Sequence, residues 1–243
     1  MAKIGIVIPT LDNLEYTQKC IASLEKYGLT SEQVFIIIDN GSDAETMKWY
    51  REYKSPFTMI VDVCGENRMV NRSWNAGLEI AKENGCEYVA FINNDIEVSG
   101  DWFGEMQRIF ESNPNIWCVC PHYTRLEKPE NFEELAKERW NNPNLALGEI
   151  GFFFVVKLTA FEELEKLDGE FGFSRQYDGG LWYEDKDFFL RLKNAGHNPI
   201  VAKHILIHHY ESKTLKKMEG LNKLKENNLK AFQKRWGYNP NIK

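Results

Sequence analysis

The first hundred residues alternate between short buried strands and helices. Runs of β-branched and aromatic residues predict the strands, and apolar residues at helical spacing predict the segments between them. The predicted strands are residues 3–9, 34–38, 58–63 and 87–93, and the predicted helices are residues 14–27, 44–54 and 71–85. Strands that alternate with helices are typical of a parallel sheet covered on both faces. We therefore expect an α/β fold with a Rossmann-like, mostly parallel central sheet and helices on both faces.

The second half of the chain is less regular. It predicts strands at 117–123, 151–157 and 200–210, helices at 159–167 and 181–196, and an acidic helix and loop at 127–147 that we expect over a cleft. A last helix has an apolar side of Leu221, Leu224, Leu229, Phe232 and Trp236. Because no linker or repeat interrupts the chain, we expect one domain over residues 1–214, with a helical extension, residues 215–243, packed on it.

Polar residues follow the predicted strands at their carboxyl ends, which is where ligands bind in open α/β sheets. They are Thr10 to Asn13 after the first strand, Asp39 after the second, Asn67 and Asn71 beyond the third, and Asn93, Asn94 and Asp95 after the fourth. Asn and Asp are also ordinary turn formers, so each position alone indicates only a turn. Their convergence on one edge of one sheet predicts a binding cleft.

The cleft lacks the glycine-rich loops that usually hold phosphates. Neither GxGxxG after the first strand nor GxxxxGK[ST] occurs, which argues against a dinucleotide site or a P-loop. Phosphates bound without such a loop need a cation, and Mg²⁺ or Mn²⁺ takes carboxylate oxygens together with phosphate oxygens. Asp95 can supply a carboxylate, and Asn93 can hold a metal-bound water or contact a ribose.

Several motifs together resemble family 2 glycosyltransferases, the nucleotide-diphosphosugar transferases of the GT-A fold. The family's opening strand and Pro-Thr is matched by VIPTLDN, its Asp-rich turn by IIIDNGSD, and its N-x-x-x-N-x-G region by NRMVNRSWNAG. Its Asp-x-Asp metal motif is matched by Asn93-Asn94-Asp95, with Asn in the first place. Its later Glu-Asp signature resembles WYEDKDFFLRLKNAG, and its closing His-rich strand resembles ILIHHYES. The resemblance covers residues 3–214.

The resemblance implies a nucleoside diphosphate sugar as donor, UDP-linked by expectation, and Mn²⁺ or Mg²⁺ as cofactor. Asp39 would hold the nucleotide base. The other residues of the nucleotide-sugar side would be Pro9, Thr10, Leu11, Asp12, Asn67, Asn71, Asn75, Asn93 and Asn94. Asp95 would bind the metal together with His208 or His209, and the spacing favours His208. Helix capping and turn formation explain the asparagines equally well.

The same resemblance implies an inverting reaction. Asp185 matches the family's general base, and Glu184 would orient the sugar or the base. Taken alone, Glu184, Asp185 and Asp187 are an acidic first helical turn favoured by the helix dipole, a position that tends to lower a carboxylate pKa. Trp182 and Tyr183 would stack on a sugar face or simply pack.

Two other function classes share parts of this pattern. Nucleotidyltransferases open with glycines and basic residues after the first strand, and TLDNLEYT has neither. A non-catalytic sugar-nucleotide sensor would keep Asp39 and lose the base, whereas Glu184 and Asp185 are both present. The acceptor is left open by the sequence: a glycan, a lipid-linked sugar, a protein or a modified nucleic acid base.

Charge and cysteine content add expectations about location. From Glu211 onward there are nine Lys or Arg and three Glu, a balance of +6 within a chain of net charge −6. Such a basic segment indicates either a solvated helix face or peripheral contact with an anionic surface. The five cysteines form no CxxC, and most lie in apolar stretches, so we expect buried free thiols and a cytoplasmic protein that is peripheral at the membrane at most. We expect neither a spanning helix nor a signal peptide.

Overall fold

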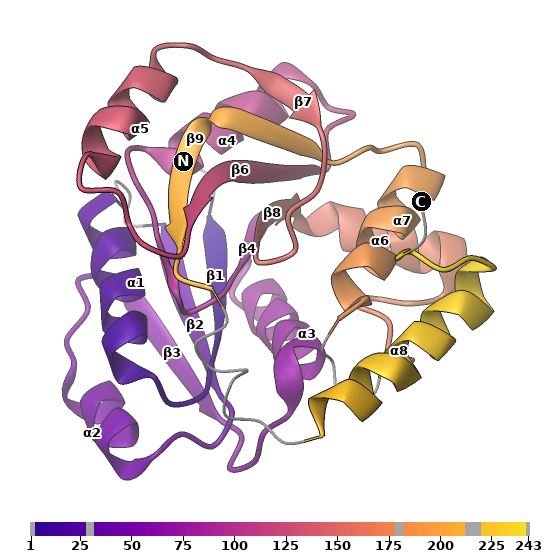
Figure 1. The fold of residues 1–243 in the computed structure, drawn as a ribbon, viewed down its shortest axis with the longest axis horizontal. Helices are drawn as coiled ribbons and strands as arrows, with labels where there is room; N and C mark the ends of the chain where they lie inside the picture. Colours follow the sequence, from indigo (N-terminus) through magenta and orange to yellow (C-terminus); the bar gives the residue numbers. More distant parts are fainter. Residues whose placement is uncertain (1–2, 28–31, 178–181, 212–219, 242–243) are drawn as a thin grey trace.

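The computed structural model describes residues 3–27, 32–177, 182–211 and 220–241, which form layers of helices on a central mixed sheet (Figure 1). The strands are β1 (Ile4–Thr10), β2 (Gln33–Asp39), β3 (Thr58–Val63), β4 (Tyr88–Ile92), β5 (Ile96–Glu97), β6 (Cys118–Arg125), β7 (Leu145–Leu147), β8 (Phe153–Lys157) and β9 (Ile200–His209). The helices are α1 (Leu14–Tyr27), α2 (Ala44–Glu52), α3 (Met69–Glu83), α4 (Trp102–Ser112), α5 (Phe132–Trp140), α6 (Leu158–Asp168), α7 (Glu184–Asn194) and α8 (Leu221–Trp236).

The sheet has the order β3-β2-β1-β4-β8-β6-β9-β5, with β7 paired to β9. The first four strands are parallel, as the alternation of strands and helices predicts. Beyond them, β8 runs antiparallel to β4 and to β6, while β6 and β9 are parallel. The carboxyl ends of β1, β2 and β4 therefore open at the same edge.

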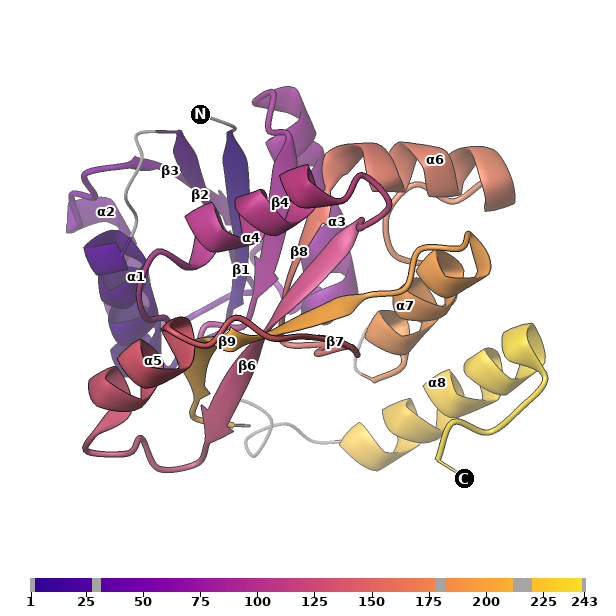
Figure 2. The ribbon, with the colours of Figure 1, turned by 90° about the horizontal axis from the view of Figure 1, so that it is seen from above.

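Each face of the sheet is buried under its own helices. Alternate residues of β1 point to opposite faces, as strand geometry requires. Ile4, Ile6 and Ile8 belong to the apolar cluster with α1 and α4, and Val7 belongs to the cluster with α3, α6 and α7. Figure 2 shows α4 crossing in front of β1 and β4, with α3 behind them.

The structure adds elements that the sequence analysis lacked. Helix α4 has apolar residues at helical spacing, and Asp101 caps it by accepting a hydrogen bond from the Gly104 N–H at 3.1 Å. The segment 127–147, expected to be a helix and loop over the cleft, contains the expected helix, and its loop includes a strand that was not expected. It forms α5, which packs on β9, and the short strand β7.

The C-terminal helix α8 lies on the outer side of α7, away from the sheet (Figures 1 and 2). Phe232 is fully buried in a cluster with Tyr177 and Tyr183, and Leu229 and Trp236 pack at its margin. Leu221 and Leu224, which the sequence placed on the same apolar side, lie outside that cluster. The expected boundary at residues 214 and 215 lies outside the described residues.

Two simpler expectations can also be compared with the structure. All five cysteines are free; Cys64 is half-buried and the others are buried. Within the described part of the chain, no helix is both long and apolar enough to cross a membrane.

Candidate active site

The end of β2 is shaped by Asp39, whose side chain is fully buried. Its Oδ2 atom accepts hydrogen bonds from the Gly41 and Ser42 N–H groups, both at 3.1 Å, and Gly41 takes the positive φ of 86° that this turn requires. Its Oδ1 atom accepts a hydrogen bond of 3.4 Å from the hydroxyl of Thr10, its partner in register on β1. The predicted base-binding residue therefore also holds its own loop in place.

The loop after β1 is tied to the loop after β2. The Asp12 N–H donates to the Ser42 hydroxyl at 2.8 Å, and the Asp12 carboxylate accepts from the Asp43 N–H at 2.9 Å. Pro9 is buried within β1, and Leu11 is half-buried just beyond it. Four predicted nucleotide residues, Pro9 to Asp12, thus lie at one edge beside Asp39.

The asparagines around α3 make specific hydrogen bonds to backbone groups. Asn67 accepts from the Met69 N–H at 2.9 Å, next to the start of the helix. Asn71 donates to the Ser174 carbonyl at 2.9 Å, while Asn75 both donates to the Phe173 carbonyl and accepts from its N–H, at 3.0 and 2.8 Å. Asn71 and Asn75 therefore fasten residues 173–174 to α3. They also line a pocket of about 510 Å³ between α3 and this segment.

The Asn93-Asn94-Asp95 motif spreads over three environments. Asn93 is half-buried, and its N–H donates to the Phe152 carbonyl at 2.9 Å. Asn94 is buried and donates to the Thr17 hydroxyl at 2.9 Å. Asp95 is buried, with its Oδ1 atom 3.2 Å from Nε2 of His209. The three consecutive residues thus face different partners.

The two adjacent histidines lie in different surroundings, as expected for neighbours in a strand. His209, not the His208 favoured by sequence spacing, lies beside Asp95, and its ring stacks on Phe152 with centroids 3.9 Å apart. His208 shares a 2.9 Å hydrogen bond between its Nδ1 atom and the Thr124 hydroxyl, and burial lowers its pKa to about 4. Of the two histidines, the geometry therefore favours His209 as the partner of Asp95.

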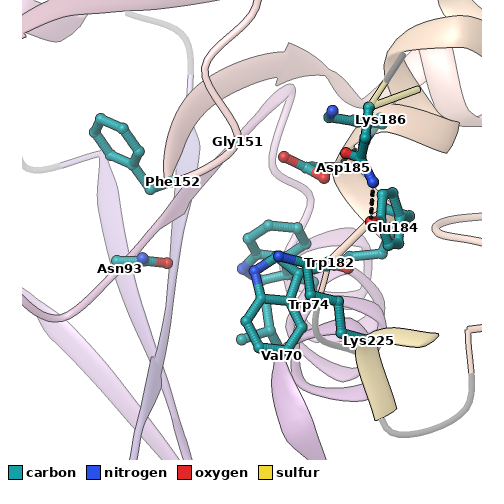
Figure 3. A pocket seen from close by; sticks show the side chains of 12 residues that line it. Val70, Trp74, Asn93, Gly151, Phe152, Trp182, Glu184, Asp185, Lys186 and Lys225 are labelled. Carbon is teal, nitrogen blue, oxygen red and sulfur yellow. Dashed lines mark hydrogen bonds between the residues drawn. The ribbon is translucent and has the colours of Figure 1, made fainter. Parts of the chain in front are cut away.

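A pocket of about 350 Å³ lies between Asn93 and the start of α7. Figure 3 shows Glu184, Asp185 and Lys186 along one wall, with Asn93 and Phe152 opposite them. The residues that complete its lining are Val70, Trp74, Gly151, Trp182, Tyr183, Lys225 and Asn241. The pocket brings the predicted base and the first residue of the Asn-Asn-Asp motif to one cavity.

Burial reverses the expected direction of the pKa shifts at this helix start. Loss of hydration, with the nearby charge of Asp185, raises the pKa of Glu184 to about 8, and burial also raises the pKa of Asp185. Oε2 of Glu184 is buried and has no hydrogen-bond partner among the described residues, whereas Asp185 accepts from the Lys186 N–H at 2.8 Å. A raised pKa suits a general base, because the base must hold a proton after the transfer.

The segment before α7 has an unusual backbone. Trp182 and Tyr183 have φ angles of 66° and 77°, in the left-handed region that non-glycine residues seldom adopt. Tyr183 is held there by Phe232, with ring centroids 5.7 Å apart, and by the Asn241 carboxamide, which donates to its hydroxyl at 2.9 Å. Strained residues of this kind cluster at functional sites, where the surrounding structure maintains them.

Asp187 differs from its acidic neighbours, because it does not line the pocket. Its side chain is fully buried, and its Oδ1 atom accepts hydrogen bonds from the Tyr177 hydroxyl at 3.0 Å and from the Trp236 indole at 2.8 Å. Nε of Arg235 lies 3.1 Å from the same oxygen. Asp187 therefore joins α7 to α8.

Sequence reasoning missed seven of the residues that line this pocket: Val70, Trp74, Gly151, Phe152, Lys186, Lys225 and Asn241. Lys186 stands inside the quoted Glu-Asp signature and could have been found there. Gly151 and Phe152 precede β8, and only the antiparallel pairing of β8 with β4 brings them to Asn93. Lys225 is one of several lysines in α8, and nothing in the local sequence distinguishes it.

Comparisons with known proteins agree with this geometry. A sequence profile for the family described as Glycosyl transferase family 2 matches residues 5–164, well over half of the chain. An uncharacterized glycosyltransferase of Bacillus subtilis, YfnE, is 25% identical over 144 residues, which are 56% of this chain and 36% of that protein. The uncharacterized protein y4gI of Sinorhizobium fredii is 30% identical over 118 residues, 48% of this chain and 13% of that protein. The matched region is thus the smaller part of either relative.

The fold is also found among solved structures. The crystal structure of GalNAc-T7 with UDP, GalNAc and Mn²⁺ matches 86% of this chain and 44% of that chain, with a TM-score of 0.67 and 11% sequence identity. At this identity the likeness concerns the fold alone, and it confirms the expected GT-A architecture.

Proposed function

This chain belongs to glycosyl transferase family 2, and from that premise we propose a specific reaction. The protein moves a sugar from a nucleoside diphosphate, UDP by preference, to an acceptor hydroxyl, and the anomeric centre is inverted. The observation that carries the proposal is the pocket in which Asp185 faces Asn93 (Figure 3), at the edge where Asp95 and His209 lie together. A base, a sugar-sized space and a candidate metal position then adjoin one another.

The donor lies at the carboxyl ends of β1, β2 and β4. Asp39 and the loop Pro9 to Asp12 bind the nucleotide, with Asn67 and Asn94 nearby. Asn71 and Asn75 support the site through their hydrogen bonds to residues 173–174. Asn93 contacts the sugar or the ribose, because its side chain lines the pocket that Asp185 shares.

The residues at the end of β4 fit a divalent cation that is shared with the donor. Asp95 offers a carboxylate 3.2 Å from Nε2 of His209, and the buried Nδ1 of His209 has no hydrogen-bond partner among the described residues. No group of three or more His, Cys, Asp or Glu side chains in the described ranges could hold a metal alone. Diphosphate oxygens would therefore complete the coordination, as is usual for Mg²⁺. Such a cation balances the charge of the departing diphosphate.

The proton and the electrons can be followed through one displacement. Asp185 takes the proton of the acceptor hydroxyl as that oxygen bonds to the anomeric carbon. The bond between the anomeric carbon and the phosphate oxygen breaks, and its electron pair leaves with the nucleoside diphosphate. Glu184, protonated at neutral pH because of its raised pKa, donates a hydrogen bond that orients the sugar or Asp185.

The test is an assay of several nucleotide sugars with Mn²⁺ or Mg²⁺, in which released nucleoside diphosphate is measured and the product anomer is identified by NMR. Release that depends on the metal and on Asp185, with an inverted anomer, supports the proposal. Donor binding without any release would favour the non-catalytic sensor. Formation of a nucleoside triphosphate from donor and pyrophosphate would favour a nucleotidyltransferase.

Helix α8 carries exposed lysines such as Lys230 and Lys234. We propose a weak peripheral contact between this helix and an anionic surface, because clustered lysines attract such surfaces over roughly a Debye length. Co-sedimentation with vesicles that contain phosphatidylserine, compared with neutral vesicles, tests this. Equal sedimentation with both kinds of vesicle would contradict this contact and would indicate that these lysines only keep the surface of the helix hydrated.

A further inference from the structure

Two lysines line the pocket that the base faces. Lys186 follows Asp185 in α7, and Lys225 reaches the pocket from α8, with its Nζ atom 5.1 Å from the centroid of the Trp182 ring. In the described part of the chain, neither ammonium group forms an ion pair with a carboxylate; their recorded contacts are with the rings of Tyr183 and Trp182. Figure 3 shows Lys225 extending beside Trp182. Lys186 is half-buried, and Lys225 is exposed where α8 borders the pocket.

The position of Lys225 is fixed by the packing of its helix. Phe232 is fully buried against Tyr183, and the Trp236 indole donates to Asp187 at 2.8 Å. Arg235 also contacts the Glu170 carboxylate at 2.7 Å. Because these contacts attach α8 to α7, the backbone that carries Lys225 is held beside the pocket before any ligand binds.

The charges that line the pocket are not balanced. Glu184 is protonated at neutral pH because burial raises its pKa to about 8. Asp185 must be ionised to act as the proposed base and then contributes one negative charge, while Lys186 and Lys225 contribute two positive charges. Among the residues that the structure describes, no other ionisable side chain lines this pocket apart from Tyr183. A ligand with one further negative charge would complete the balance, and oppositely charged groups in such a partly enclosed space attract more strongly than in water.

We propose that the acceptor is an anionic sugar, whose carboxylate or phosphate group binds between Lys186 and Lys225. This inference rests on the proposed transferase function. The sugar ring would lie beside the indoles of Trp74 and Trp182, which also line the pocket. Its free hydroxyl would then reach Asp185. Two cations in the pocket of the base therefore select an acceptor by charge as well as by shape.

The test compares charged and neutral sugars as probes. The full chain, saturated with UDP and Mn²⁺, is titrated with methyl glucuronide and methyl glucoside, and with glucose 1-phosphate and glucose. We expect the charged member of at least one pair to bind about tenfold tighter or better, and to lose affinity as salt rises. Preference for the glucuronide would indicate a uronic acid, and preference for glucose 1-phosphate would indicate a phosphorylated acceptor.

Lys186→Met and Lys225→Met should each remove most of this preference and leave the affinity for UDP unchanged. Lys223→Met is the matched control, since Lys223 is exposed on the same helix and does not line the pocket. Equal or absent binding of the charged and neutral sugars overturns the inference. So does a loss of UDP affinity in the lysine variants, which would assign both lysines to the donor diphosphate. Wild-type protein that binds no UDP in the presence of Mn²⁺ would instead count against the proposed function.

Discussion

The carboxylate of Asp185 lies directly against Gly151. A β-carbon at position 151 would come within 1.8 Å of Oδ2 of Asp185, closer than any real contact allows. The next residue, Phe152, accepts a hydrogen bond from the Asn93 N–H at 2.9 Å. The short segment before β8 thus sets the position of both walls of the pocket.

Gly151→Ala should therefore displace the base without unfolding the protein. Gly151 does not have a positive φ, so alanine can adopt its backbone conformation, and the Asp185 side chain must rotate away. Misplacement of a catalytic group by about 1 Å can cost about a hundredfold in rate. We expect transfer to fall at least about tenfold, while UDP affinity and the melting temperature change little. The measurement is transfer rate at saturating donor.

Gly148→Ala is the matched control for that substitution. Gly148 lies in the same segment before β8 as Gly151 but away from Asp185. A β-carbon at position 148 would come within 2.9 Å of a methyl group of Val201. It should lower the melting temperature and leave the rate per folded molecule near that of the wild type. If the Gly151→Ala protein transferred sugar as fast as the wild type, catalysis would not require the observed position of the Asp185 carboxylate.

The N-terminal half of the fold could be predicted because its strands and helices are defined by local patterns. β-branched runs and helical spacing identify β1 to β4 and their connecting helices without any tertiary information. The later strands pair out of chain order, some antiparallel and β6 with β9 parallel, and β7 has only three residues, so no local pattern fixes their partners. The missed helix α4 did have a signal, namely Asp101 before an amphipathic segment.

The candidate site divides in the same way. Asp95 and Asp185 stand in ordered motifs and could be proposed from the sequence. Which of His208 and His209 lies beside Asp95 could not, because it depends on how β9 pairs with β5. The raised pKa of Glu184 could not be predicted from the sequence either. The dipole at a helix start lowers a carboxylate pKa, whereas the burial of this side chain raises it.

Asp185→Asn should separate binding from chemistry. The substitution keeps the size of the side chain but removes the group that accepts the acceptor's proton, and general-base catalysis contributes roughly 10²–10⁴-fold. We expect normal donor affinity and a loss of at least about a hundredfold in transfer at saturating donor. Turnover close to that of the wild type would show that another residue is the base.

Asp187→Asn, two residues along the same helix, should affect stability instead. Asparagine retains an oxygen for Tyr177 and Trp236 but leaves Arg235 with one fewer anionic partner in a largely buried network. We expect a loss of about 1–3 kcal/mol in the free energy of unfolding. Transfer per folded molecule should fall far less than in Asp185→Asn. Chemical denaturation and rate measurements on both variants give the comparison, and an inactive but fully stable Asp187→Asn protein would contradict it.

Asp95→Ala should abolish the metal-dependent part of donor binding. The fold should survive, because Asp95 lies in a short connection between β4 and β5 and its side chain pairs with His209. His209→Ala should weaken Mn²⁺-dependent UDP binding in the same direction. His208→Ala should not, since that ring bonds to Thr124. Calorimetric titration of UDP with Mn²⁺ and with a chelator provides the test, and a stronger effect at His208 would reverse the assignment.

Glu184→Gln should stabilise the protein increasingly as pH rises. The folded protein keeps the Glu184 proton up to about pH 8, whereas the unfolded chain releases it near pH 4.5. Between these values the folded state binds more protons, so this group lowers stability as pH rises, by about 1.4 kcal/mol per pH unit, and the effect levels off above pH 8. Glutamine removes the cost because it never ionises. The melting temperatures of variant and wild type should therefore differ by only a few degrees near pH 5 and by roughly 10–20 °C at pH 8–9. Glu83→Gln, at an exposed position on α3, is the control and should show no such trend. A difference that stays constant with pH, or shrinks as pH rises, would mean that Glu184 is ionised in the folded protein at neutral pH and does not donate the hydrogen bond proposed for it.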